Sequence, residues 1–296
     1  MGAAVLVTGT SGLVGGAVAR MLRGRGQTVL GVDVRPGPGT DVVGDLRRLD
    51  LASVTERAAP AAVVHLAALH APHVGRQPDA DFWSINVDAT AALLAAAAAA
   101  GATRFVFAST TSVYGAAMRP GPDATAAAWV DETLTPEPED VYDATKLAAE
   151  ALVAAAHPTG GTGHASSGGM VTLTLRIGRC FPESPPVLAA HRLHRGVDLR
   201  DVVQAHRLAL DAARAAGDGP LVANVAGPLV FRRDDRPALL TDAAAVIDRR
   251  VPGLRQAFVR RGWSLPATID RVYDSSRARR ALGYAPVHDA WATLAP

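Results

Sequence analysis

The sequence predicts an α/β fold in which helices cover both faces of a doubly wound parallel sheet, with a smaller lobe toward the C-terminus. Short runs of apolar and β-branched residues alternate with longer helix-forming segments through most of the chain. A glycine-rich turn between Gly9 and Gly15 joins the first of these runs to the first helical segment. Strands that alternate with helices are joined by right-handed crossovers, and such crossovers build a parallel sheet.

The predicted strands share a high content of valine and other apolar residues, and they cover residues 4–7, 28–32, 62–66, 104–107, 171–177 and 221–226. The predicted helices cover residues 13–25, 83–100, 141–156 and 201–216, with a weaker candidate at 49–59. An alanine-rich run through Ala100 stops at Gly101 and is shorter than the ~20 residues that span a bilayer. We therefore expect a buried core helix at this position and no membrane partner.

Two segments interrupt this alternation. Residues 157–169 are rich in glycine and serine without any periodicity, which predicts a mobile surface loop. Residues 178–195 contain three prolines and show no clear period. We therefore predict a nucleotide-binding domain at 1–177 that is re-entered at 198–226. Residues 178–197 and 227–296 form a small lobe that closes over substrate.

The composition is that of a soluble globular protein, with 49% hydrophobic and 20% charged residues in 296 positions and a net charge of +2. Its arginine pairs are scattered and lack interleaved aromatic residues, so no nucleic-acid partner is expected. Cys180 is the only cysteine, which excludes an intrachain disulfide and a cysteine-ligated zinc ion. We expect no metal site, and we expect a cytoplasmic protein because the first strand begins without a signal-peptide pattern.

The glycines at positions 9, 12 and 15 have the spacing of a dinucleotide-binding turn, between a strand and a helix. Gly9 permits the tight turn, Gly12 lets backbone N–H groups reach a pyrophosphate, and Gly15 lets the helix approach the strand closely. An ordinary glycine-rich turn is the alternative. The helix N-terminus adds a favourable dipole for the bound anion.

Acidic and small residues follow further strands. Asp33 ends the second strand, where a carboxylate meets ribose hydroxyls and repels a 2′-phosphate, so NAD is favoured over NADP despite Arg35 nearby. Asp45 and Leu46, together with residues 65–68, lie at two more strand ends on the same predicted edge. Ala67 and Ala68 are small enough for a cofactor to pass closely, whereas His65 is interpreted as a packed residue without chemistry.

A second group of residues has the properties of an acid/base site. Residues 105–115 form a strand that ends in the hydroxyl cluster of Ser109, Thr110, Thr111 and Ser112, and such hydroxyls can bind an oxygen whose charge changes. Tyr142 and Lys146 are four residues apart and share a helix face. We expect the Lys146 ammonium to lower the pKa of Tyr142 from about 10 toward working pH. A lone Tyr-x-x-x-Lys is usually a surface feature, but beside a dinucleotide turn it indicates hydride chemistry.

These motifs together resemble the extended short-chain dehydrogenases/reductases of the NAD-dependent epimerase/dehydratase family. The resemblance covers essentially the whole chain, at residues 8–15, 33, 45–46, 65–68, 86, 109–115, 142–146 and 273–286. It implies a Rossmann-type sheet, Tyr142 as the acid/base and Thr110 as the hydroxyl bonded to the reacting oxygen. Lys146 would hold the nicotinamide ribose, and Asn86 would lie near the cofactor in a mainly structural role.

The residues that we predict to contact NAD are Gly9, Ser11, Gly12, Leu13, Val14, Gly15, Asp33, Asp45, Leu46, Leu66, Ala67, Ala68, Asn86, Tyr142 and Lys146. The sequence also departs from the family in two places. Sugar-nucleotide 4,6-dehydratases carry an Asp-Glu pair after the catalytic threonine, but Thr111 and Ser112 stand here, which disfavours dehydration. The stretch between Arg176 and Asp201 is shorter than in members that bind a nucleoside diphosphate, so a small sugar, uronate or polyol is also considered.

The predicted function is NAD-dependent hydride transfer at a secondary alcohol or ketone of a sugar-like or sugar-nucleotide substrate, as a dehydrogenase or an epimerase. Arg179, Arg192, His194 and Arg195 could meet an anionic group of that substrate, or they could be ordinary surface charges. A reductase of a non-sugar biosynthetic carbonyl and a non-catalytic NAD(P)-sensing protein are the alternatives. The family resemblance implies a homodimer.

Overall fold

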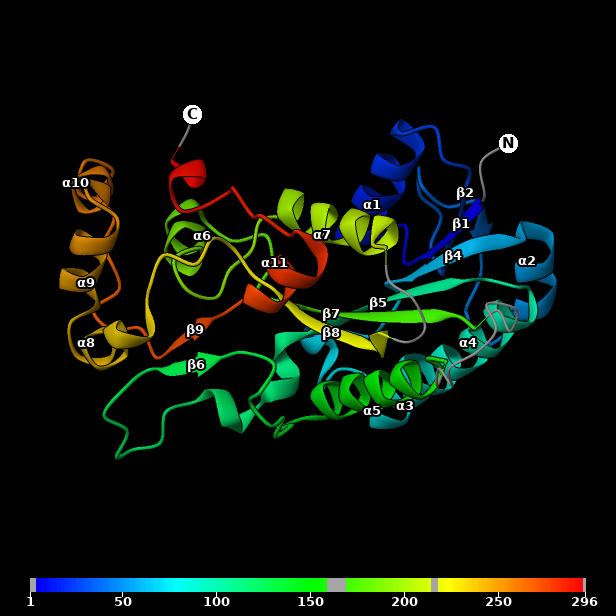
Figure 1. The fold of residues 1–296 in the computed structure, drawn as a ribbon, viewed down its shortest axis with the longest axis horizontal. Helices are drawn as coiled ribbons and strands as arrows, with labels where there is room; N and C mark the ends of the chain where they lie inside the picture. Colours follow the sequence, from blue (N-terminus) through cyan, green and yellow to red (C-terminus); the bar gives the residue numbers. More distant parts are fainter. Residues whose placement is uncertain (1–3, 159–168, 214–217, 295–296) are drawn as a thin grey trace. The chain divides into compact units, whose positions relative to one another are not determined.

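The computed structural model describes residues 4–158, 169–213 and 218–294 (Figure 1). The chain divides into two compact units. The first, here called the sheet unit, comprises Met1–Val113, Pro138–Arg176 and Val203–Val222. The second unit comprises Tyr114–Glu137, Ile177–Val202 and Ala223–Pro296.

The seven-stranded sheet consists of β1 (Ala4–Thr8), β2 (Val29–Asp33), β3 (Val42–Val43), β4 (Pro60–His65), β5 (Arg104–Thr110), β7 (Val171–Ile177) and β8 (Leu221–Val225). Its order is β3-β2-β1-β4-β5-β7-β8. The ladders β1–β2, β1–β4, β2–β3 and β4–β5 are parallel. The strand order reverses between β1 and β4, and the crevice beyond the carboxyl ends at such a reversal is where open α/β sheets bind ligands.

The helices of the sheet unit are α1 (Leu13–Gly24), α2 (Leu51–Ala58), α3 (Asp79–Trp83), α4 (Ala89–Ala99), α5 (Val141–Ala155) and most of α7 (Leu199–Asp211). Helices α2, α4 and α5 cover one face of the sheet, and α1 and α7 lie on the other (Figure 1). Between α2, α4, α5 and the sheet lies an apolar core that includes Leu93, Phe105 and Val153. This core exists because β1, β4 and β5 carry apolar side chains on both faces.

A π-helical turn, η2 (Ser84–Asp88), joins α3 to α4, so one helical segment runs over 21 residues from Asp79 to Ala99. Within the described part of the chain, this segment alone is long and apolar enough to meet the criteria for a membrane span. It buries Phe82, Asn86 and Leu93, and it packs against α2 and α5. A core helix of a soluble protein meets the same criteria, so its length and composition are weak evidence for a membrane.

The second unit contains a two-stranded parallel sheet, β6 (Ala128–Val130) with β9 (Arg271–Tyr273). Its helices are α6 (Pro185–His191), α8 (Arg236–Thr241), α9 (Ala243–Arg250), α10 (Leu254–Val259) and α11 (Ser276–Leu282). A separate apolar core includes Trp129, Ile247 and Phe258. Short 3₁₀ turns occur in the two units at η1 (Ala71–His73), η3 (Thr111–Tyr114), η4 (Ala116–Met118), η6 (Arg233–Asp235) and η7 (Trp291–Thr293).

All six predicted strands and the helices at 13–25, 49–59, 83–100 and 141–156 are found, with ends displaced by a few residues. Helix α7 ends at Asp211, short of the predicted 216, and residues 214–217 lie outside the described part. The segment predicted to be irregular at 178–195 contains α6, which begins at a proline pair. Most of the predicted mobile loop, residues 159–168, also lies outside the described part.

Residues 114–137 belong to the second unit, whereas the sequence analysis assigned them to the nucleotide-binding domain. The reason is that β6, within this segment, pairs with β9 near the C-terminus. Asn224 adds a second link, because its side chain accepts from the Tyr114 hydroxyl at 2.9 Å and donates to the Val130 carbonyl at 3.2 Å. No local pattern in the sequence indicates such distant partners.

Candidate active site

The backbone around the glycine turn between Gly9 and Gly15 is packed so closely that a side chain at Gly9 or Gly15 would clash with it. Gly9 has a φ of +76°, and its N–H donates to the Val32 carbonyl at 2.8 Å. A Cβ on Gly15 would lie 2.1 Å from the Gly9 carbonyl oxygen, so only glycine lets α1 start this close to β1. Gly12 is the N-cap of α1 and has no side-chain capping bond. The turn therefore presents an uncapped helix N-terminus, which fits a pyrophosphate.

Asp33 is fixed at the end of β2 by the same turn. Its carboxylate accepts from the Ser11 N–H at 2.9 Å and from the Arg35 N–H at 2.9 Å. The Ser11 hydroxyl in turn donates to the Arg35 carbonyl at 2.8 Å. The carboxylate is thus held in one orientation with lone pairs left for ribose hydroxyls, as a dinucleotide requires. Of the other turn residues, Leu13 is exposed and Val14 is half-buried.

The loop after β4 lies directly against the glycine turn. A Cβ on Gly9 would be only 2.8 Å from the Ala67 nitrogen. The Thr8 hydroxyl accepts from the N–H groups of Leu66 and Ala67, both at 3.1 Å. Ala68 is half-buried beside them. The turn and this loop therefore form one continuous backbone surface at the carboxyl ends of β1 and β4.

Asp45 has a different environment from the one expected of a cofactor contact. Its carboxylate forms a close ion pair with Arg47, with Nη2 and Oδ2 2.6 Å apart. The hydrogen bond from Arg47 lowers the pKa of Asp45. Leu46 packs against the apolar core of the sheet unit. In this structure the Asp45 carboxylate is paired with Arg47, and Arg47 also pairs with Asp81.

His65 has the structural role that the sequence analysis assigned to it. Its ring is buried, with Nδ1 2.7 Å from the Thr8 hydroxyl and Nε2 2.9 Å from the Thr90 hydroxyl. Burial lowers the pKa of His65 to about 3, so the ring is neutral. The ring links Thr8 at the end of β1 to Thr90 of α4.

Asn86 ties the same region to α5. Its Nδ2 donates to the Leu69 carbonyl at 3.1 Å and to the Thr145 hydroxyl at 3.1 Å, and its Oδ1 accepts from the Leu69 N–H at 2.8 Å. Thr145 in turn donates to the Tyr142 carbonyl at 3.0 Å. The amide is fully used within the protein, so Asn86 positions the start of the helix that carries Tyr142.

Thr110, at the end of β5, lies near Tyr142 in the first turn of α5, close enough for its hydroxyl to lower the pKa of that phenol. Helix α5 begins at Asp140, whose side chain accepts from the Asp143 N–H. Burial raises the pKa of Tyr142 above its usual value, the nearby Thr110 hydroxyl lowers it, and the charges of Asp143 and Asp140 raise it further. The expectation that Lys146 lowers this pKa is wrong for this structure, because desolvation of the phenolate dominates. Tyr142 is a neutral phenol here.

Lys146 lies one turn further along α5 and is 3% exposed. Its ammonium donates to the Ala108 carbonyl at 2.7 Å and lies 4.0 Å from the centre of the Phe107 ring. Burial lowers the pKa of Lys146 to about 7, although the Glu150 carboxylate raises it. The amine can therefore change its charge near neutral pH.

A buried ion pair behind Lys146 escaped the sequence analysis. Glu150, a further turn along α5, accepts from Arg176, at 2.6 Å from Nη2 and at 3.0 and 3.2 Å from Nε. The Ser109 hydroxyl also donates to Glu150. The available signal was the spacing of Tyr142, Lys146 and Glu150, each four residues from the next, which places all three on one helix face.

Two further residues near Tyr142 were also missed. The His70 ring is exposed, and its centroid lies 6.3 Å from that of Tyr142. The Asp143 Oδ2 accepts from the Glu139 N–H at 3.4 Å, but its Oδ1 is buried without a partner. Burial, followed by the charge of Asp140, raises the pKa of Asp143 to about 6. His70 directly follows the loop of residues 65–69 and could have been recognised from that position.

The sheet unit thus combines a dinucleotide turn with a buried phenol, an amine and a hydroxyl, which defines a nicotinamide-dependent enzyme of the Rossmann type. The model of the NAD dependent epimerase/dehydratase family matches residues 5–180. The chain belongs to this family. It is an NAD-dependent enzyme of the extended short-chain dehydrogenase/reductase type.

Known proteins agree with this assignment. The chain is 30% identical over 325 aligned positions to dTDP-glucose 4,6-dehydratase from Streptomyces griseus, covering 96% of the chain and 90% of that protein. It is 34% identical over 163 residues to UDP-glucose 4-epimerase from Rhizobium leguminosarum bv. trifolii, covering 52% of the chain and 47% of that protein. A short-chain dehydrogenase/reductase superfamily protein from Agrobacterium tumefaciens, solved with bound NAD, has a TM-score of 0.67 and 26% identity, covering 98% of the chain and 94% of that structure.

Proposed function

We propose that this enzyme oxidises a secondary alcohol, or reduces the corresponding ketone, on a carbohydrate-like small molecule, and that Thr110, Tyr142 and Lys146 are its catalytic residues. The observation that carries the proposal is that the Thr110 hydroxyl lies near the buried Tyr142 phenol, with the buried Lys146 on the same helix face. Two relatives that act by name on nucleotide-linked glucose support a sugar-like substrate.

The chemistry divides between cofactor and protein. When bound, NAD supplies the acceptor and donor of hydride. We propose that Gly9, Ser11, Gly12, Gly15, Asp33 and the loop of residues 66–68 hold it, together with Tyr142 and Lys146. Leu13, Val14, Asp45, Leu46 and Asn86 complete the proposed set, although the Asn86 amide and the Asp45 carboxylate are engaged by protein groups.

Proton transfer belongs to the protein. As a neutral phenol, Tyr142 can give its proton to the oxygen of a ketone that is being reduced, while the Thr110 hydroxyl donates to the same oxygen. In the oxidative direction the phenolate takes the proton of the substrate hydroxyl. A raised pKa makes the phenolate a strong base but leaves little of it at neutral pH, so we expect oxidation to accelerate with rising pH.

The substitution that tests this assignment is Tyr142→Phe, which removes the exchangeable proton and keeps the ring. We expect turnover to fall by about 10²–10⁴-fold, with NAD affinity retained. Turnover is measured as NADH absorbance with a panel of hexoses, hexuronates and sugar nucleotides. Tyr284→Phe is the matched control, because that buried hydroxyl donates to the Ala226 carbonyl in the second unit. Full activity in Tyr142→Phe contradicts the proposal.

The choice between epimerase and dehydrogenase depends on whether the cofactor leaves. Denaturing the purified protein and assaying the supernatant for NAD and NADH distinguishes them. Retained cofactor supports an internal oxidation and reduction, and an empty protein that reduces added NAD supports net oxidation. Thr111 and Ser112 stand where a 4,6-dehydratase needs an acidic pair, so we propose that water is not eliminated.

We further propose that residues 178–197 and 227–296 bind the substrate, that the enzyme is a homodimer, and that it works in the cytoplasm without nucleic-acid or membrane partners. The small net charge of +2 supports the absence of nucleic acid. Size-exclusion chromatography with light scattering tests the dimer.

A further inference from the structure

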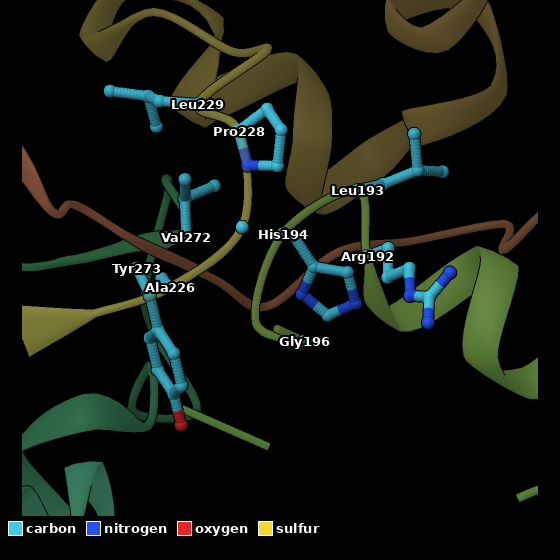
Figure 2. A pocket seen from close by; sticks show the side chains of 10 residues that line it. Arg192, Leu193, His194, Gly196, Ala226, Pro228, Leu229, Val272 and Tyr273 are labelled. Atoms are coloured by element: carbon cyan, nitrogen blue, oxygen red, sulfur yellow. The ribbon is translucent and has the colours of Figure 1, made fainter. Parts of the chain in front are cut away.

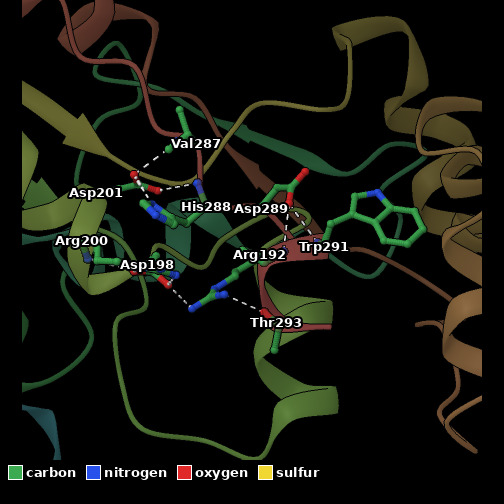
Figure 3. A network of polar contacts seen from close by, with 10 residues as sticks. Arg192, Asp198, Arg200, Asp201, Val287, His288, Asp289, Trp291 and Thr293 are labelled. Atoms are coloured by element: carbon green, nitrogen blue, oxygen red, sulfur yellow. Dashed lines mark hydrogen bonds and ion pairs between the residues drawn. The ribbon is translucent and has the colours of Figure 1, made fainter. Parts of the chain in front are cut away.

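Four basic residues of the second unit were named as possible contacts of an anionic group, and two of them are committed to the protein. Arg192 donates from Nη1 to the Thr293 hydroxyl at 2.6 Å and pairs with Asp198 (Figure 3). Arg179 makes a bidentate pair with Glu183, with contacts at 2.6 Å from Nη2 and 3.0 Å from Nε. Both guanidiniums are therefore neutralised by carboxylates.

Arg195 differs from these two. Within the described residues no carboxylate lies within ion-pair distance of its guanidinium. Its Nη2 donates to His191 Nε2 at 2.7 Å. Its Nε is buried without a hydrogen-bond partner, as is that of Arg192, so the absence of a paired carboxylate is what distinguishes Arg195. An unpartnered buried donor on a cation costs free energy that an added anion would recover.

A neutral histidine orients Arg195. His191 Nδ1 lies 3.0 Å from a Glu183 oxygen, so Nδ1 carries the proton and Nε2 accepts from Arg195. Burial lowers the pKa of His191, and the charges of Arg195 and Arg179 lower it further, whereas Glu183 raises it. Glu183, His191 and Arg195 therefore form a chain in which each hydrogen bond has one donor and one acceptor.

His194 cannot provide the positive charge. Its Nδ1 donates to the Arg271 carbonyl at 2.9 Å, and burial lowers the pKa of His194 to about 3. The neutral ring therefore keeps Nε2 as a hydrogen-bond acceptor, which suits a hydroxyl group. The side chain lines a small pocket with Gly196, Ala226 and Tyr273 (Figure 2).

When the charged side chains around Arg195 are paired with one another, the positive charge of Arg195 itself remains without a carboxylate among the described residues. Electrostatic neighbours of Arg195 are Arg271, Arg179 and Asp270. Arg271 pairs with Asp270 at 2.5 Å, and Arg179 pairs with Glu183. One carboxylate would balance the remaining charge of Arg195, whereas a nucleoside diphosphate brings at least two charges and needs more free donors.

We infer that Arg195 binds the carboxylate of a small hydroxylated acid, such as a sugar acid, and that His191 positions Arg195 for this contact. The inference rests on the proposed function, because it names the substrate class of that reaction.

The test measures binding instead of turnover, in the NAD-loaded Tyr142→Phe protein, by titration calorimetry with glucuronate, glucose and UDP-glucose. We expect glucuronate to bind at least tenfold more tightly than glucose, and Arg195→Gln to abolish that preference. Arg200→Gln is the matched control, since this exposed arginine pairs with Asp198, and it should keep the preference. Melting curves show whether each variant is folded.

Variants at His191 separate positioning from folding. His191→Leu removes the acceptor of Arg195 and should weaken glucuronate binding but not glucose binding, and His191→Gln, whose amide oxygen also accepts, should restore it. Equal affinity of Arg195→Gln and its parent for glucuronate overturns the inference. Tighter binding of UDP-glucose than of glucuronate overturns it too. Neither result depends on Tyr142, so a failure of the proposed redox role would be seen separately, as turnover in Tyr142→Phe.

Discussion

At the scale of single residues, Lys146 is the most informative side chain. It is the only lysine among 30 basic lysine and arginine residues, so every other such cation in the chain is an arginine. Arginine stays charged at all accessible pH values and needs a wide planar site, whereas a buried lysine can lose its proton. The single lysine of the chain is therefore also a buried amine, and burial lowers its pKa to about 7.

The charge of Glu150 keeps this amine protonated, and this can be measured directly. Glu150→Gln removes the carboxylate that raises the pKa of Lys146, so that pKa should fall by roughly one unit below about 7. With ¹³C-labelled lysine the protein gives a single side-chain signal, whose pH titration reports the value. Glu56→Gln, at an exposed position of α2, is the control and should leave the titration unchanged. An unshifted titration in Glu150→Gln contradicts the electrostatic role.

The sequence predicted the placement of some of these residues but not their partners or their pKa values. The spacing of Tyr142 and Lys146 predicted that they share a face of a helix, and both are buried in α5. The partner of Glu150 could not be predicted, because Arg176 is on β7, beyond a segment without periodicity. The raised pKa of Tyr142 also depends on burial, which spacing does not reveal.

At the scale of elements, the predictions succeeded where local pattern decides the structure. Strands β1, β4 and β5 are buried on both faces and appear as short apolar runs in the sequence. Strands β6 and β9, each of three residues, pair across more than a hundred positions and escaped notice. Helix α6 was missed because its two prolines suggested a loop, although proline is favourable in the first turn of a helix.

The glycine turn gives a prediction for a whole element. In Gly15→Ala the new Cβ would lie 2.1 Å from the Gly9 carbonyl oxygen, and backbone at that distance cannot move aside without opening the turn. We expect NAD affinity to fall at least about tenfold and the melting temperature to decrease. Calorimetric titration with NAD measures the affinity.

Gly24→Ala is the matched control, because this glycine lies in α1 and a Cβ there meets nothing within 4 Å. Alanine should stabilise the helix slightly, by roughly 0.5–1 kcal/mol, and leave NAD binding unchanged. If Gly15→Ala binds NAD as tightly as Gly24→Ala does, the close contact between α1 and β1 is not what shapes the cofactor site.

At the scale of the whole molecule, different interactions stabilise each of the two units. The sheet unit has parallel ladders and one large apolar core. Among its described residues, the second unit has a short two-stranded ladder of its own and two isolated β-bridges, and ion pairs add to its apolar core. Asp235 is the strongest example, since it is 2% exposed and contacts two arginines of α9 and the backbone of Arg232.

The ion pairs of Asp235 predict how the second unit responds to acid. Burial alone would raise the pKa of Asp235, but hydrogen bonds from Arg250, the Arg232 N–H and Arg249 outweigh it and lower the pKa to about 2. A carboxyl whose pKa is lower in the folded state stabilises that state above its unfolded value of 3.8, and this contribution is lost as pH falls toward 2. Both arginines are partly exposed, so solvent screening reduces the effect to about 1–2 kcal/mol.

Asp235→Asn should therefore lower the free energy of unfolding by about 1–2 kcal/mol above pH 4, and the difference from the parent should shrink between pH 4 and pH 2. Urea unfolding followed by circular dichroism across this range measures it. Asp248→Asn is the matched control, because Asp248 is on α9, the helix that carries the two arginines bound to Asp235, and pairs with Arg255 where both side chains are more than 40% exposed. It should change stability less than Asp235→Asn does above pH 4, because solvent screens an exposed ion pair. If Asp235→Asn lowers the free energy of unfolding by the same amount at every pH, the loss comes from packing and not from charge. If it lowers that free energy no more than Asp248→Asn does, burial of the Asp235 ion pairs adds nothing to the stability of the second unit.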